Sequence, residues 1–252
     1  MGRAGISAAG GGPGSIVFWT AAAILIGMAM VAGAAYVLNG RPADSPLGSP
    51  LPPRVVTPAG IESSGQTLGS PGAGVTIDVW EDYRCTYCYD FTTTSEPQLV
   101  DRYVKTGKAR LVYHDLLTID THPPFGTESR DAANASLCAR DQGEFWTYHD
   151  WLFANQSPHE DPGAFTLDRL VAIGKDAGLN MAAFEPCVRN GTHLANVKAE
   201  QAGAPSDATV TPSIFVNNKR CPNYTYDVVS AAIDTALKSA PSSSGSAAPS
   251  RS

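Results

Sequence analysis

Residues 75–88 read VTIDVWEDYRCTYC, and this stretch decides the fold. Its first five residues alternate between apolar and polar side chains and then lead into Trp80, a period of two that predicts a strand. Cys85 and Cys88 follow at once, where the strand pattern gives way to a helical one over residues 85–105. The first turn of a helix presents unpaired N–H groups and the positive end of the helix dipole, and both stabilise a thiolate. We therefore expect Cys85 to be a nucleophile of lowered pKa and Cys88, one turn later, to be the resolving thiol.

The two cysteines enclose the dipeptide Thr86-Tyr87, and this spacing has more than one interpretation. Residues three apart lie on one face of a helix, so the sulfurs can switch between dithiol and disulfide with little movement of the backbone. A zinc site would need two further clustered ligands, and the sequence has no second C-x-x-C and no H-x3–5-H. A static structural disulfide would close only a very short loop, which gains little stability. The pattern favours a redox-active pair, and we expect no metal and no cofactor.

The rest of the pattern is that of an α/β unit. Residues 111–113 predict a second strand, and because a helix separates it from the first, the two strands are expected to be parallel. Residues 213–216 predict a strand that ends in a turn, and residues 227–237 predict a helix with one apolar stripe. An all-helical insert is expected over about residues 127–204. Its helical segments are 129–141, 144–154, 167–177, 181–190 and 193–201.

Three runs of sequence, in this order, carry a resemblance to a known family: VTIDVWEDYRCTYC at 75–88, CARDQGEFWTYHDWLF at 138–153 and VTPSIFVNN at 210–218. Together they resemble the DsbA-like branch of the thioredoxin superfamily, over about residues 67–237. The resemblance implies a thioredoxin-like fold with a helical insertion. It also implies that Thr211 and Pro212 form a cis-proline loop, which offers backbone hydrogen bonds to a bound substrate strand.

The sequence departs from the family pattern in two places. Thr86 stands where relatives often have proline, so the family's redox potential is not carried over. Val79 stands six residues before the first cysteine, where several relatives have a buried acid. Glu81 and Asp82 are the candidates to replace that acid as proton acceptor for the resolving thiol. The alternative is that both carboxylates face solvent at the end of the strand.

Three further cysteines lie outside the C-x-x-C. Cys138 and Cys187 fall on apolar faces of two insert helices, and such thiols often pair in an oxidising compartment, so we expect a structural disulfide between them. Cys221 is then free, buried, or the true partner of one of the two. Packing of a reduced thiol in the core is the alternative for all three. His114 and His149 are expected to be packing residues rather than catalysts.

The ends of the chain differ in composition from the middle. Residues 1–15 predict a short cytoplasmic stub, and the uncharged apolar residues 16–38 predict a transmembrane helix of about 34 Å. Residues 39–53 are rich in Pro, Gly and Ser, which predicts a linker, and 239–252 predict a disordered tail. Residues 54–238 remain as one folded domain. A cleaved signal peptide is the alternative for the apolar segment.

Charge and composition narrow the function. Acids outnumber bases by 24 to 18 and the chain has no Lys/Arg run, which argues against a nucleic-acid surface. We expect a monomeric, single-pass protein of the cell membrane whose extracytoplasmic domain forms disulfides in reduced exported proteins. The resemblance implies reoxidation by a membrane partner of the DsbB or vitamin K epoxide reductase type. The alternatives are a disulfide reductase or isomerase, or a redox-inactive peptide-binding module.

We predict that the mature protein keeps residues 16–38 and fractionates with membranes. The reason is that this uncharged run is longer than the roughly 7 to 15 apolar residues of a signal peptide. Cell fractionation with N-terminal sequencing checks this, and a mature terminus near Ala35 would contradict it.

Overall fold

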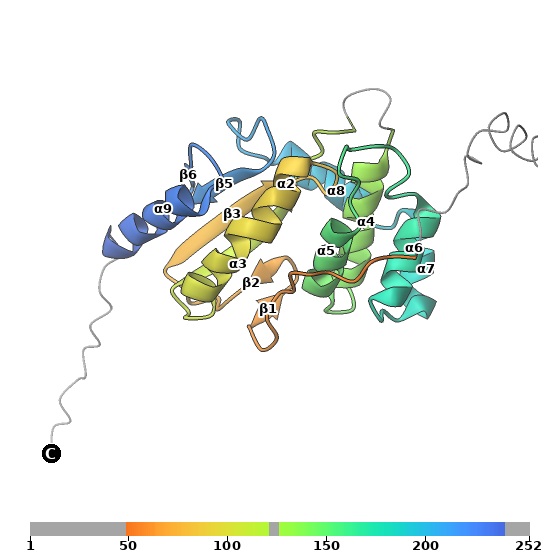
Figure 1. The fold of residues 1–252 in the computed structure, drawn as a ribbon, viewed down its shortest axis with the longest axis horizontal. Coiled ribbons are helices and arrows are strands. Elements are labelled where there is room, and N and C mark those ends of the chain that lie inside the picture. Colours follow the sequence, from red (N-terminus) through yellow and green to blue (C-terminus); the bar gives the residue numbers. More distant parts are fainter. Residues whose placement is uncertain (1–48, 121–125, 240–252) are drawn as a thin grey trace, which may run out of the picture. The chain divides into compact units, whose positions relative to one another are not determined.

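A computed structural model of the chain describes residues 49–120 and 126–239 (Figure 1). The predicted stub, the predicted transmembrane helix and nearly all of the predicted tail lie outside these residues. Within the described part, no helix has both the length and the apolar character needed to cross a bilayer.

A six-stranded mixed sheet, in the order β1-β2-β4-β3-β5-β6, forms the centre of the fold. Strands β3 and β4 are parallel from Val75 opposite Ala109 to Glu81 opposite Asp115, which confirms the predicted crossover. Strand β5 is antiparallel to β3. The sequence pattern missed β1, β2 and β6, because a strand of two residues has no period to detect. The strands are β1 (Ser63–Ser64), β2 (Thr67–Leu68), β3 (Val75–Glu81), β4 (Ala109–Asp115), β5 (Ser213–Val216) and β6 (Lys219–Arg220).

One long helix connects β3 to β4, as predicted, although it is not α-helical throughout. It consists of α2 (Thr86–Asp90), the π-helix η1 (Phe91–Ser95), α3 (Glu96–Leu99) and the π-helix η2 (Val100–Val104). Pro97 lies in the first turn of α3 and has no N–H to donate to the preceding turn. The chain passes this proline with a wider π turn on either side of α3. We call this element the active-site helix.

The sheet is packed on both faces, completely on one and partly on the other. On one face Val79 of β3 belongs to the main core together with Phe91 of the active-site helix and Ile233 of α9 (Tyr226–Ser239). On the other face Trp80 packs with Leu116, Ala208 and Phe215. Figure 1 shows the active-site helix lying across the sheet beside β3. The alternation that predicted β3 therefore separates a fully buried face from a partly covered one, on which Trp80 is buried while Thr76 and Asp78 are half-buried.

The helical insert matches the predicted segments to within about one residue at each end. Local capping sets two of these ends: the Thr166 side chain accepts the N–H of Arg169, and the Asn180 side chain accepts the N–H of Ala182. Gly191 closes α7 in the left-handed conformation, with φ of 62°. The insert helices are α4 (Glu128–Arg140), α5 (Phe145–Ala154), α6 (Leu167–Asp176), α7 (Met181–Asn190) and α8 (Leu194–Ala202).

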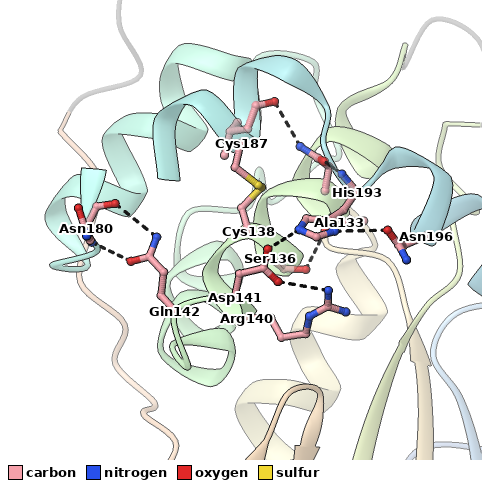
Figure 2. The surroundings of a disulfide bond; sticks show 12 residues. Ala133, Ser136, Cys138, Arg140, Asp141, Gln142, Asn180, Cys187, His193 and Asn196 are labelled. Atoms are coloured by element: carbon pink, nitrogen blue, oxygen red, sulfur yellow. Dashed lines mark hydrogen bonds and ion pairs between the residues drawn. A yellow bond between two sulfur atoms is a disulfide. The ribbon is translucent and has the colours of Figure 1, made fainter. Parts of the chain in front are cut away.

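A disulfide between Cys138 and Cys187 joins α4 to α7, as expected from the sequence (Figure 2). The two Cα atoms are 5.9 Å apart and the bond spans 49 positions of sequence. Beyond the end of α4, Gln142 and Asn180 exchange two hydrogen bonds of 3.3 and 2.9 Å. The disulfide and this polar pair therefore hold the two helices together at separate points.

The segment that precedes the sheet is bound to the insert from Leu51 onward, before the predicted domain start at residue 54. The backbone N–H of Leu51 donates to Asn155 Oδ1 at 2.9 Å, and Asn155 Nδ2 donates to the carbonyl of Leu51 at 2.9 Å. Thr57 N–H donates to Asp150 Oδ2 at 2.6 Å. The last residues of the predicted linker at 39–53 are thus bound to the insert, because a Pro-rich segment can still pair its remaining backbone groups with a side-chain amide. Residues 39–48 of that linker lie outside the described residues.

We predict that the disulfide between Cys138 and Cys187 resists mild reduction. In the chain-entropy model a closed loop of this length stabilises the fold by roughly 4 kcal/mol. Peptide mapping after mild dithiothreitol and alkylation should find Cys85 and Cys88 labelled and the insert pair still linked. A peptide that joins Cys221 to either insert cysteine would contradict the pairing.

Candidate active site

The C-x-x-C lies at the start of the active-site helix, just after β3, as the sequence predicted. Cys85 is the N-cap residue, with extended backbone (φ −72°, ψ 122°), and Cys88 lies one turn later. Cys85 is 4% exposed and Cys88 is fully buried. Both thiols are free in this structure. The pair is therefore asymmetric, because an attacking group can reach only the first sulfur.

The peptide bond between Thr211 and Pro212 is cis, and this loop lies against Cys85. The Cys85 thiol donates to the carbonyl of Thr211 at 3.4 Å. A hydrogen bond from the Cys88 thiol lowers the pKa of Cys85; burial opposes this shift, and Thr211 together with the N–H groups of Cys88 and Tyr87 adds to it. The structure thus brings together the two parts of the site that lie far apart in the sequence.

Cys88 has the opposite character. Burial raises the pKa of its thiol well above the ordinary value, and the hydrogen bond with Cys85 and the charge of Glu81 raise it further. A thiol of this kind holds its proton at neutral pH, while Cys85 is the more readily ionised partner. This is the division of roles expected for a nucleophile and a resolving thiol.

Glu81 and Asp82 are both buried, so the interpretation that they face solvent was wrong. The Asp82 carboxylate accepts the N–H groups of Arg84, Thr118 and Ile119, each at 2.9 Å. It therefore ties the loop after β4 to the loop before the active-site helix. Glu81 instead shares the main-core face of β3, and burial raises the pKa of its carboxyl.

Glu81 belongs to a buried ionisable cluster with Glu96, His149 and Asp150. His149 Nε2 lies 4.0 Å from Glu81 Oε2, and its Nδ1 lies 3.2 Å from Asp150 Oδ1. Burial lowers the pKa of His149, but the bonds to Asp150 and Glu81 outweigh it and raise the value to about 10. Burial raises the pKa of Glu96 to about 8. A charged imidazole thus faces carboxyls that burial makes reluctant to ionise, so protons can be shared within the cluster.

Metal-ligating atoms do meet in the described part of the chain. Glu81, Glu96 and His149 offer ligand atoms within 4.8 Å of one another, and so do Cys138, Cys187 and His193. In the second group the sulfurs are joined to each other, so they are not available as thiolate ligands. In the first group the pKa of His149 is raised to about 10, so a metal ion would have to displace a proton from the imidazole.

His114 and His149 pack against aromatic side chains, as expected, but both also contact carboxylates. His149 has ring contacts with Trp146 and Phe153, at 5.2 and 5.0 Å between centroids, in addition to its carboxylate partners. His114 stacks on Trp80 at 4.3 Å and pairs with Asp78 and Glu200. Each histidine therefore carries an ionic role that the aromatic pattern of the sequence did not indicate.

The loop between α5 and α6 contributes two residues that the sequence gave no reason to select. Gln156 Nε2 donates to the carbonyls of Tyr83 and Cys85, at 2.7 and 2.8 Å. Glu160 Oε1 accepts the N–H of Thr86 at 3.1 Å. Polar residues in a surface loop have no periodicity, so only the folded chain shows that they hold the start of the active-site helix.

These features agree with a comparison to known families. The family model described as Thioredoxin matches residues 62–235. The chain belongs to the thioredoxin family. Among solved structures, BdbD from Bacillus subtilis matches this fold with a TM-score of 0.63 and 24% identity, over 69% of this chain and 93% of that one. DsbA from Chlamydia trachomatis matches with a TM-score of 0.61 and 20% identity, over 76% and 100%.

A relative from Rickettsia conorii, described as a candidate protein-disulfide oxidoreductase, is 25% identical over 181 residues. The match covers 71% of this chain and 62% of that protein. The chain spans less than two thirds of the length of the curated relatives it matches. This thioredoxin-family domain therefore has DsbA-like structural neighbours and a relative described as an oxidoreductase.

A cavity of about 320 Å³ lies beside the cis-proline loop of this thioredoxin-family domain. Tyr87 and Val210 line it and are 63% and 55% exposed, which is unusual for large apolar side chains. Cys221 also lines the cavity and is free and buried, and burial raises the pKa of its thiol. Of the alternatives left open by the sequence, the structure thus has Cys221 as an unpaired core thiol.

We predict that Cys85 is alkylated faster than Cys88. We also expect the pH midpoint of its alkylation rate to lie below the free-cysteine pKa of about 8.5. The reason is the hydrogen bonding that lowers the pKa of Cys85, while burial raises that of Cys88. The rate of iodoacetamide labelling of each cysteine against pH, read by mass spectrometry, checks this. Equal labelling of both thiols, or a pH midpoint at the free-cysteine value, would contradict the assignment of Cys85 as the nucleophile.

Proposed function

We propose that this protein is an extracytoplasmic thiol:disulfide oxidoreductase that forms disulfides in exported proteins through Cys85 and Cys88. The observation that carries the proposal is the asymmetry of the pair. Cys85 caps a helix beside the cis-proline loop and has a lowered pKa, whereas Cys88 is fully buried and has a raised pKa. The relative from Rickettsia conorii supports the same activity.

The exchange starts from the oxidised pair. A substrate thiolate attacks Sγ of Cys85; a bond forms between the two sulfurs as the Cys85–Cys88 bond breaks, and its electron pair leaves on Cys88. A second substrate thiolate attacks the substrate sulfur of this mixed disulfide, and the electron pair leaves on Cys85. The substrate loses two electrons and becomes a disulfide, and the enzyme is left as the dithiol.

One proton accompanies the first step. The Cys88 thiolate takes up a proton because its pKa is raised well above the ordinary value. Glu81 is the candidate to exchange that proton, since it is buried, its charge acts on Cys88, and burial raises its own pKa. Asp82 is less suited to the role, because its carboxylate already accepts three backbone N–H groups.

The substrate strand is proposed to lie along Thr211 and Pro212, with apolar side chains on the exposed Tyr87 and Val210. The lining of the neighbouring cavity supports this position. An enzyme that ends as a dithiol must be reoxidised. A quinone-linked membrane oxidase of the DsbB or vitamin K epoxide reductase type is the partner implied by the family resemblance.

The proposed location is the outer side of the cell membrane, with a single anchor at residues 16–38 and a monomeric domain. The insert disulfide supports an oxidising compartment, because such bonds rarely persist in a cytosol kept reduced by glutathione. The uncharged apolar run supports the anchor.

The experiment is a set of single substitutions assayed on a reduced peptide dithiol. We expect both Cys85→Ser and Cys88→Ser to abolish oxidation, because neither variant can form the Cys85–Cys88 disulfide that accepts the two electrons of the substrate. When oxidised glutathione is supplied as the oxidant, Cys88→Ser should be trapped as a mixed disulfide between Cys85 and glutathione, because Cys88 is not there to displace the glutathione. Glu81→Gln should slow exchange by roughly 10²-fold, the low end for a general acid or base. A wild-type protein that binds the peptide without oxidising it, and binds it equally well as Cys85→Ser, would be only a peptide-binding module. Oxidation that survives Cys85→Ser would contradict the role of Cys85.

The direction of electron flow is tested separately. Titration of the Cys85–Cys88 pair against glutathione should give a reduction potential near that of an oxidant, about −120 mV. A value near −270 mV would favour a reductase instead.

A further inference from the structure

The loop between α5 and α6 reaches back to the first turn of the active-site helix. Glu160 Oε1 accepts both the N–H of Thr86, at 3.1 Å, and its hydroxyl, at 3.3 Å. The carbonyl of Glu160 accepts the guanidinium of the buried Arg84 at 2.5 Å. The backbone carbonyl of Glu160 is therefore bound to Arg84, and its side-chain carboxylate is bound to Thr86. These are the residues just before and just after Cys85 in the sequence.

Glu160 has an unfavourable backbone conformation that the hydrogen bonds of its loop stabilise. Its φ of 58° is rare for a residue with a side chain. Ser157 closes the loop: its hydroxyl accepts the N–H groups of His159 and Asp161, at 3.3 and 3.2 Å, and its carbonyl accepts the N–H of Glu160 at 3.2 Å. The unfavourable backbone angle is offset by these contacts and by the bonds to Arg84 and Thr86.

Glu160 binds the first N–H of the helix, which lies next to the two N–H groups that act on the Cys85 sulfur. The N–H groups of Tyr87 and Cys88 favour the ionised form of Cys85, whereas the N–H of Thr86 is bound to the Glu160 carboxylate. A carboxylate at this point stabilises the start of the helix. It also sets a negative charge beside the position where the Cys85 thiolate forms, and like charges disfavour ionisation.

Building on the proposed function, we propose that Glu160 is a positioning residue that lowers the reduction potential of the Cys85–Cys88 pair. The thiolate exists only in the reduced enzyme, so a nearby carboxylate destabilises the dithiol form and leaves the neutral disulfide unaffected. The domain is thereby a milder oxidant than the same helix would be with Thr86 N–H free. The insert, through one loop, sets the strength of the redox pair.

Among residues 49–120 and 126–239, the other charged groups around the thiols do not duplicate this arrangement. Arg84 pairs with Asp120 at 3.8 Å, and the Asp82 carboxylate binds backbone N–H groups away from the sulfur. Glu81 acts on the buried Cys88 rather than on the first N–H of the helix. Tyr224, whose pKa is raised by burial and by Asp90, is neutral at working pH.

The test compares Glu160→Gln and Glu160→Ala with Asp161→Asn in the full-length chain. Glutamine keeps an acceptor for Thr86 and removes only the charge, and alanine also frees the N–H. Asp161→Asn removes the same charge one residue later, from an exposed side chain that bonds to Ser157. Each variant is titrated against glutathione between pH 5 and pH 8, after thermal melting and mapping of the insert disulfide confirm the fold.

We expect Glu160→Gln to shift the equilibrium toward the dithiol by about tenfold at pH 8, which is about 30 mV for a two-electron couple. Glu160→Ala should shift it at least as far, and Asp161→Asn by less than twofold. The shift should vanish at a pH low enough to protonate Cys85, because a neutral thiol is indifferent to the charge. The alkylation midpoint of Cys85 should fall in the same two variants.

A potential that is unchanged in both Glu160 variants, or a shift that persists where Cys85 is protonated, would overturn the role of Glu160. An equal shift in Asp161→Asn would overturn it too, because the effect would then be one of net charge. These outcomes leave the proposed function intact as long as Cys85→Ser remains inactive. Loss of the proposed function is seen separately, as oxidation that does not depend on Cys85.

Discussion

The backbone N–H groups at the start of the active-site helix are the constraint on which the rest of this structure depends. A helix leaves its first N–H groups without intrahelical partners, and here that end lies directly after a buried strand. The N–H groups of Tyr87 and Cys88 act on the Cys85 sulfur, and that of Thr86 is bound to Glu160. The Cys85 sulfur and the Glu160 carboxylate therefore use neighbouring N–H groups of the same positive helix end.

The helical insert is part of the active site rather than an addition to its edge. Through Gln156 and Glu160 its loop holds the backbone on both sides of the nucleophile. Through His149 it provides a cation within reach of Glu81. The disulfide between α4 and α7 lies elsewhere in the insert and contributes stability instead of chemistry. One insertion thus supplies both the contacts that position the redox pair and a crosslink that restricts the unfolded chain.

The buried cluster around His149 is costly for a protein core. Removing carboxylates and an imidazole from water carries a penalty of several kcal/mol per ion unless the charges pair. Glu81, Glu96 and Asp150 surround one imidazole, and the raised pKa values of the two glutamates show how incompletely the charges are compensated. An apolar core would be more stable at this position. A cluster that can gain and lose protons beside Cys88 is what the proposed exchange reaction requires.

The sequence alone determined the order of the longer strands and of the helices, because β3 alternates with a period of two and helices such as α9 carry an apolar stripe. It also identified the C-x-x-C at the start of a helix and, through the family resemblance, the cis peptide before Pro212. Strands β1, β2 and β6 were too short to leave a pattern. Only the tertiary structure decided the environment of Glu81, which depends on a histidine 68 positions later in the chain. The same holds for Glu160, because the sequence of a polar loop does not indicate which distant N–H group a carboxylate in it will bind.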